Sequence, residues 1–153
     1  MKRHSGLVPL SHDHHHELAE ARRLLRAAGA DDAALRVAAA DRYVRVFFGE
    51  TVEHFRKEEE LLFPLYVHHA GRTAALERVL HEHMQLHGLV RALRSEAAGG
   101  DVPRERLQEL GDLLHDHVRF EERELLEEIQ RVVPAEELGA LNLPTSPAGA
   151  CEA

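Results

Sequence analysis

Apolar residues recur along four stretches of the chain at the three- and four-residue spacing of an amphipathic helix. Glycine or proline residues separate these stretches, which cover about residues 10–28, 31–66, 73–98 and 103–133. Ala, Leu, Glu and Arg dominate their composition, and these residues favour helices over strands. Four helices with short connections predict an all-α fold, an up-down four-helix bundle.

Cap and breaker residues indicate where the helices begin and end. Ser11 is the expected N-cap of the first helix, and Gly29 suits the position just after its last turn. Within the second stretch, Gly49 and Pro64 predict a local kink.

The chain is expected to change character after Pro134. A short helical turn is predicted at "PAEELGAL", and the tail from residue 142 is rich in turn-forming residues and is expected to be flexible. We therefore predict a bundle over residues 8–133, followed by a short helical turn and a disordered tail over residues 134–153.

Pairs of metal-capable side chains interrupt three of the predicted apolar faces. The pairs, each four residues apart, are His54 with Glu58, His83 with His87, and His117 with Glu121. Side chains at this spacing stand about 6 Å apart along a helix and can address the same ion. Burying them in a bundle core is costly unless they are paired or ligated. Three such helices therefore predict a metal site.

The type of donor narrows the choice of metal. Four imidazoles and two carboxylates, with no thiolate, suit iron, manganese or zinc. A single zinc ion takes about four ligands, which leaves donors over. Two ions that share bridging carboxylates use the whole set, and helical bundles commonly hold di-iron carboxylate sites.

Composition and charge exclude several other classes of protein. The 153 residues include 13 histidines and carry a formal net charge of −8, which disfavours a general nucleic-acid binder. No apolar run approaches the ~20 residues that span a bilayer. The basic N-terminus has no apolar core of a signal peptide, and Cys151 is the only cysteine. We expect a cytoplasmic protein, monomeric or a small homo-oligomer, that binds neither nucleic acid nor membranes.

The three motifs together resemble those of hemerythrin-like, or HHE cation-binding, domains. The matching stretches are "HFRKE" at 54–58, "HMQLH" at 83–87 and "HVRFE" at 117–121, and the resemblance covers about residues 8–132. It implies a hemerythrin-like bundle with two iron ions per chain, joined by an oxo or hydroxo bridge and by Glu58 and Glu121. The Glu in the last motif resembles the broader bacterial group more than the invertebrate oxygen carriers.

The family pattern also places one histidine on the first helix, where "SHDHHHEL" offers four. From His14 the helical face continues through apolar residues at 18, 21, 25 and 28, whereas from His15 it meets Arg22. We predict His14 as the ligand, with His15 as the alternative if the first turn is wound differently. The expected metal ligands are His14, His54, Glu58, His83, His87, His117 and Glu121.

The resemblance implies a centre that binds or reduces O₂, H₂O₂ or nitric oxide. Five imidazoles and two carboxylates would leave one iron a coordination position short, where such a small molecule can bind. Catalase-like disproportionation of peroxide is one activity that this centre would support. The alternative is a non-catalytic module that senses iron or oxygen, or buffers metal, and acts through a partner. A purely structural bundle with core histidines is the third interpretation.

Overall fold

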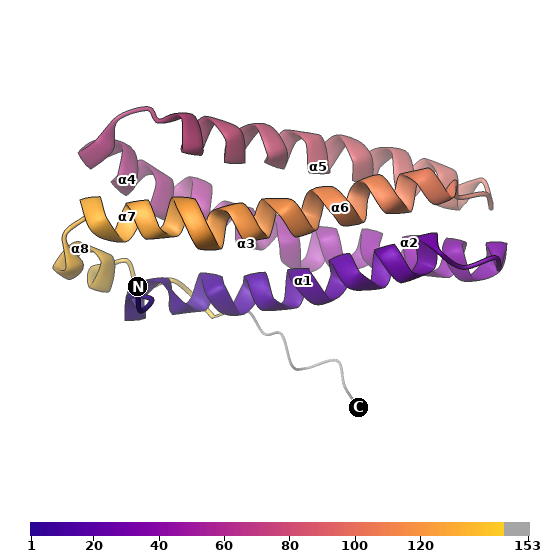
Figure 1. Cartoon of the computed structure of the whole chain (residues 1–153), viewed down its shortest axis with the longest axis horizontal. Helices are drawn as coiled ribbons and strands as arrows, with labels where there is room; N and C mark the ends of the chain where they lie inside the picture. The colour runs from indigo at the N-terminus through magenta and orange to yellow at the C-terminus, as the bar shows by residue number, and fades with distance from the viewer. Residues whose placement is uncertain (146–153) are drawn as a thin grey trace.

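In the computed structural model, which describes residues 1–145, four long helical rods lie side by side and alternate in direction (Figure 1). The first and third rods are α1 (Val8–Ala28) and α5 (Ala74–Ala98). The second joins α2 (Ala33–Val46), η2 (Phe47–Thr51), α3 (Val52–Lys57), η3 (Glu58–Leu62) and α4 (Phe63–Ala70). The fourth joins α6 (Arg104–Phe120), η4 (Glu121–Leu125) and α7 (Leu126–Val132). The predicted all-α bundle is confirmed, and the described residues contain no strand.

The first rod begins earlier than the sequence predicts. After the 3₁₀ turn η1 (Ser5–Leu7), α1 starts at Val8 with Pro9 in its first turn, a position that proline favours because its missing N–H is not needed there. The prediction of Ser11 as the N-cap is therefore wrong. Its hydroxyl instead donates a hydrogen bond to Glu122 Oε1 at 2.8 Å. Gly29 ends the helix, as predicted.

Three π-helical turns interrupt the second and fourth rods, and two of them lie where the sequence repeats a pattern. The stretches "HFRKEEELLFP" and "HVRFEERELLE" fold alike, because η3 begins at Glu58 and η4 begins at Glu121. The third π turn, η2, contains Gly49. Pro64 lies in the first turn of α4, and the rod continues beyond it to Ala70. Single π turns inside helices often lie at functional sites, because they reorient the side chains around them.

The apolar core has two parts, and a polar layer separates them along the bundle. One part includes Leu18, Phe55, Leu86 and Val118, all buried. The other part includes Leu10, Leu62, Val79 and Leu125, about two turns away on the same four rods. Between these levels, each rod carries a buried histidine or glutamate: His14, Glu58, His83 and Glu121.

The last short helix, α8 (Ala135–Ala140), packs against η1 at the end of the bundle where the N-terminus lies (Figure 1). The predicted helical turn is thus confirmed. Leu138 and Leu143 are buried in the second part of the core, so the prediction of a flexible tail from residue 142 is wrong at Leu143. Residues 146–153, including Cys151, lie outside the described residues.

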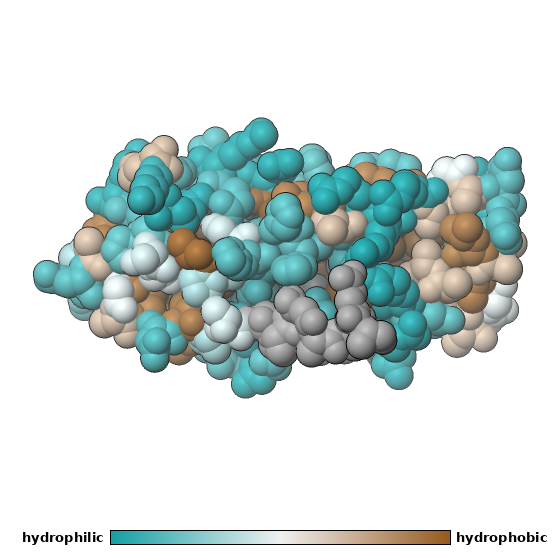
Figure 2. Space-filling view, turned by 90° about the horizontal axis from the view of Figure 1, so that it is seen from below, coloured by the Kyte–Doolittle hydropathy of each residue, from teal (hydrophilic) through white to brown (hydrophobic). Residues whose placement is uncertain are grey.

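Hydrophilic side chains cover most of the face shown in Figure 2, and the more continuous apolar area lies at the right-hand end of the view. Among the described residues, no helix is both long and apolar enough to cross a membrane.

The contact between η1 and α8 depends on glycine at position 6. A Cβ atom at Gly6 would lie 2.2 Å from the backbone oxygen of Leu138, so Gly6→Ala must displace α8. We expect this substitution to lower the free energy of unfolding by about 1–3 kcal/mol in urea titrations. The control is Gly88→Ala, because a Cβ at this helical position meets no atom within 4 Å. The control should gain about 0.5–1 kcal/mol, and equal stability of Gly6→Ala and the unmodified protein would contradict the prediction.

Candidate metal centre

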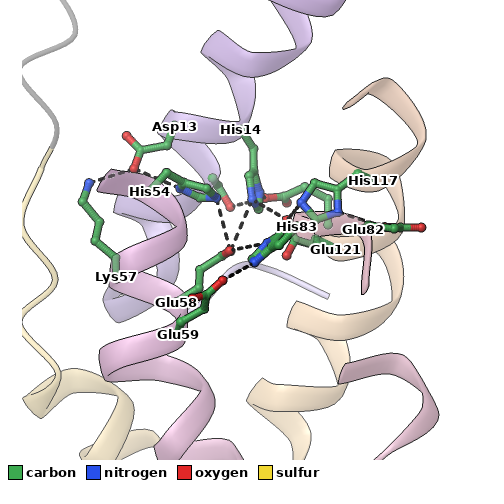
Figure 3. A network of polar contacts seen from close by, with 12 residues as sticks. Asp13, His14, His54, Lys57, Glu58, Glu59, Glu82, His83, His117 and Glu121 are labelled. Carbon is green, nitrogen blue, oxygen red and sulfur yellow. Dashed lines mark hydrogen bonds and ion pairs between the residues drawn. The ribbon is translucent and has the colours of Figure 1, made fainter. Parts of the chain in front are cut away.

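All four rods contribute ligand-type side chains to one buried layer (Figure 3). Each of these side chains is at most 2% exposed, and they are His14 of α1, His54 and Glu58 of the second rod, His83 of α5, and His117 and Glu121 of the fourth rod. They form two groups in which candidate ligand atoms lie within 4.8 Å of one another, and Glu121 belongs to both groups.

The first group joins α1 to the second rod. His14 Nε2 lies 2.9 Å from Glu121 Oε2 and 3.6 Å from Glu58 Oε1. His54 Nε2 lies 3.2 Å from the same Glu58 Oε1. The two imidazoles are in edge-to-face contact, with their ring centroids 4.6 Å apart.

The second group joins α5 to the fourth rod. His117 Nε2 lies 3.4 Å from Glu121 Oε2, and His83 Nε2 lies 3.4 Å from Glu58 Oε2. The two oxygens of Glu58 therefore face different groups. Both glutamates lie between the two pairs of histidines.

The atoms that point into this layer have no hydrogen-bond partner. They are the Nε2 atoms of all four histidines and both carboxylate oxygens of Glu58 and Glu121. Leaving one buried polar atom unsatisfied costs about 1–3 kcal/mol, and more for a charged group. Eight such atoms converge from the four rods. Bound metal ions would satisfy them, because nitrogen and carboxylate oxygen atoms can coordinate the same ion. The residues present therefore suit a cation site of imidazole and carboxylate donors.

Two outer carboxylates hold the histidines of the His-x-x-x-Glu motifs. Asp13 Oδ2 lies 3.2 Å from His54 Nδ1, and Glu82 Oε2 lies 2.8 Å from His117 Nδ1. Each of these carboxylates belongs to the residue directly before another ligand histidine in the chain.

Two further carboxylates hold the remaining histidines. Glu59 Oε1 lies 2.6 Å from His83 Nδ1, and Glu122 Oε1 lies 2.6 Å from His14 Nδ1. Each directly follows a ligand-type glutamate in the chain. A carboxylate at Nδ1 fixes the ring orientation and directs Nε2 to the metal, as in many metal sites with histidine ligands. All four imidazoles of the layer have this arrangement.

Basic side chains neutralise three of the outer carboxylates. Lys57 Nζ lies 2.8 Å from Asp13 Oδ2, and Arg3 lies 2.8 Å from Glu122 Oε2. Arg78 lies 2.8 Å from Glu82 Oε1. These pairs offset part of the negative charge that the carboxylates bring close to the buried layer.

The charges within the layer favour protonated histidines when no metal is bound. Burial by itself lowers the pKa of His54, but the Glu58 and Glu17 carboxylates outweigh it and raise that pKa to about 10. Burial likewise opposes protonation of His83, yet Glu58 and Glu59 raise its pKa to about 9. Burial also disfavours a charged Glu58, and the facing histidines nevertheless hold its pKa well below the usual range. Metal binding requires neutral imidazoles, so it must release these protons.

The structure brings together six of the seven sequence-predicted ligands. His14 is buried, whereas the alternative His15 and its neighbours His12 and His16 are exposed, so helical phase located the inward-facing histidine correctly.

The expectation that His87 joins the cluster does not agree with this arrangement. His87 is exposed and belongs to neither group of candidate ligands. Its ring packs edge-on against Phe47, with centroids 5.1 Å apart, and lies 6.0 Å from Phe55. Both aromatic side chains are buried in the apolar core, and Phe55 also stacks on His83 with ring centroids 3.7 Å apart.

The outer carboxylates are the functional residues that the sequence analysis missed. Glu59 and Glu122 lie off the apolar faces of the predicted helices, so the sequence pattern predicts that they are solvated. A detectable signal was the repeated His-x-x-x-Glu-Glu, together with an acidic residue directly before His14 and before His83.

An all-helical bundle with a buried histidine–carboxylate cluster defines the class of four-helix metal-binding proteins. The sequence profile of the Hemerythrin HHE cation binding domain matches residues 7–129. The chain therefore belongs to the hemerythrin HHE cation-binding family. Comparisons with curated proteins and with solved structures give no significant match.

The raised histidine pKa values predict how the stability of the metal-free protein depends on pH. A group whose pKa is raised by folding stabilises the fold below its unfolded pKa, about 6.5 for histidine, and this contribution is lost as pH rises through the folded value. Thermal unfolding in chelator should therefore show falling stability between about pH 7 and pH 10, the window given by His83 and His54. Metal should stabilise the protein more as pH rises, because it no longer competes with protons. Equal metal-free stability at both ends of the window would disprove this account.

Metal content distinguishes the inward histidine from its neighbours. His14→Ala removes a donor of the first group and should lower the amount of metal bound per chain. His15→Ala and His87→Ala remove exposed imidazoles and serve as matched controls that should keep the full content. Elemental analysis after anaerobic loading measures all three. Loss of metal in either control, with none in His14→Ala, would show that the ligands are assigned wrongly.

Proposed function

We propose that this chain is a non-haem di-iron protein whose centre binds or reduces O₂, H₂O₂ or nitric oxide. The observation that carries the proposal is the convergence of eight unpartnered donor atoms in one buried layer. Four imidazoles and two carboxylates exceed the needs of one ion and match two ions that share Glu58 and Glu121. Imidazole and carboxylate donors in a helical bundle are typical of di-iron sites.

The six-residue donor set leaves room for a small ligand. Each ion would receive two imidazole nitrogens and one oxygen from each shared glutamate, which makes four protein donors. Iron commonly takes up to six ligands, so both ions would keep exchangeable positions. A seventh donor from His87 would occupy one of them, but His87 is exposed and belongs to neither group of candidate ligand atoms.

The chain's own residues prepare the site for redox chemistry in three ways. The outer carboxylates fix each imidazole at Nδ1, so Nε2 stays aimed at the layer. Phe55 stacks on His83 with ring centroids 3.7 Å apart and closes one side of the layer to water. The apolar core above and below excludes solvent from the donors. Iron, when bound, supplies two accessible oxidation states for electron transfer to a small oxygen or nitrogen species.

A second candidate function is an iron- or oxygen-sensing, or metal-buffering, module that acts through a partner. The charge balance of the layer favours it, because metal must displace protons and satisfy atoms that are otherwise unpaired. Metal occupancy would then strongly change stability, which is the property that a sensor needs. We propose for either function a small-molecule ligand and a cytoplasmic monomer or small homo-oligomer, without binding to nucleic acid or membranes.

Two measurements on iron-loaded protein test these functions. We expect two iron atoms per chain by elemental analysis and an optical spectrum that changes when O₂, H₂O₂ or nitric oxide is added. Oxygen evolution from H₂O₂ above that of free iron would establish catalase-like turnover. Full iron content without such turnover, and with a large gain in thermal stability, would favour the sensing module. Less than one iron per chain after anaerobic loading would disprove the di-iron proposal.

A further inference from the structure

A small cavity opens beside the cluster, between α1 and the segment from the end of α2 to α3. Its volume is about 20 Å³, enough for about one water molecule or one ion. His16 and Glu50 lie at its exposed rim, and Glu17 and the ligand histidine His54 are buried. The cavity therefore leads from solvent to one side of the cluster.

Carboxylates dominate the lining of this cavity, but two of them already have cationic partners. Glu20 pairs with Arg23 and lies 2.7 Å from Arg42. Asp13 pairs with Lys57 and with His54 (Figure 3). Glu17, in contrast, has no hydrogen-bond partner at either carboxylate oxygen.

Glu17 is a buried carboxylate whose hydrogen-bonding capacity is unused. Its side chain belongs to a residue that is 6% exposed, and neither Oε1 nor Oε2 has a hydrogen-bond partner. Burial raises the pKa of Glu17, and the nearby histidines His54 and His14 oppose this increase. An unpaired buried acid is costly to retain, and a positively charged ligand would satisfy it.

The opposite half of the cluster shows that this polar lining is not required by the fold. Since α5 repeats the pattern of α1 around its ligand histidine, Leu86 holds the position that corresponds to Glu17, three residues after the histidine. In the fourth rod, Leu113 and Leu114 correspond in the same way to Glu50 and Thr51 of the second rod. Leu86 and Leu114 are fully buried in the core. One half of the cluster is thus closed by leucines, and the other half opens through acids.

We propose that this cavity is an uptake site for a divalent cation, at which Glu17 is a transient ligand that passes the ion to His54 and the cluster. The inference rests on the proposed di-iron function. The charge of the lining favours a cation over a neutral gas, which needs no carboxylates, and over an anion, which they would repel. Because the cavity holds about one water, a hydrated ion must exchange most of its water for protein oxygens on entering. Glu17 and the rim residue Glu50 supply oxygens for that exchange.

The test compares the rate of metal loading with the final metal content. Metal-free protein is mixed anaerobically with Fe²⁺, and uptake is followed by quenching samples with a chelator and measuring bound iron. Glu17→Gln should slow loading at low Fe²⁺ by about tenfold, within the range that charged clefts contribute to association rates. The control is Glu105→Gln, which removes the same charge from an exposed position at the start of α6. Added NaCl should slow the unmodified protein and reduce its advantage over Glu17→Gln.

The outcomes separate this inference from the proposed function. Slow loading of Glu17→Gln to the same final iron content and the same spectrum, with normal loading of Glu105→Gln, supports the uptake site. Loading of Glu17→Gln at the unmodified rate overturns it, even if two irons bind. A lower final content in Glu17→Gln also overturns it, because Glu17 would then be a resident ligand. Failure of the unmodified protein to bind two irons would instead disprove the di-iron proposal.

Discussion

The inward orientation of four buried imidazoles is the constraint on which the rest of this structure depends. Each ring is held at Nδ1 by a carboxylate outside the cluster, so each Nε2 must face the centre, where no protein group satisfies it. The apolar core can exclude water from these atoms only because it packs above and below them on all four rods. Coordination of metal makes this burial favourable, because it satisfies the nitrogen and carboxylate donors together.

The cluster is built from two copies of one local pattern. In the second and fourth rods, a histidine is followed after four residues by a glutamate that starts a π turn, and then by a glutamate that holds a histidine of another rod. In α1 and α5, an acidic residue directly precedes the ligand histidine and holds the histidine of a neighbouring motif. The result is a closed ring of contacts in which each rod orients a side chain of another. Loss of one outer carboxylate would therefore disturb a ligand that belongs to a different helix.

Helical periodicity was sufficient to predict the bundle, the three motifs and the inward histidine of α1. It identified His14 because its face continues through apolar residues, and burial follows directly from that pattern. It did not predict the exposure of His87, whose ring packs against Phe47 and which belongs to neither group of candidate ligands. The position that corresponds to His87 in α1 is Leu18, a core residue. The sequence pattern did not predict the role of the outer carboxylates, because each of them contacts a histidine of another rod. The periodicity of a single helix contains no information about such contacts.

The two halves of the cluster, one at α1 and the second rod and the other at α5 and the fourth rod, differ in the residues around the ligands. Lys57 in the second rod neutralises Asp13, whereas the corresponding residue of the fourth rod is Phe120, on which Arg78 stacks at 3.8 Å while pairing with Glu82. The same task, compensation of an outer carboxylate, is thus performed from different rods. The half with Lys57 also contains the acid-lined cavity, and the half with Phe120 is sealed by leucines. Two ions held by equivalent donors would therefore differ in their access to solvent, because access is set by residues outside the ligand set.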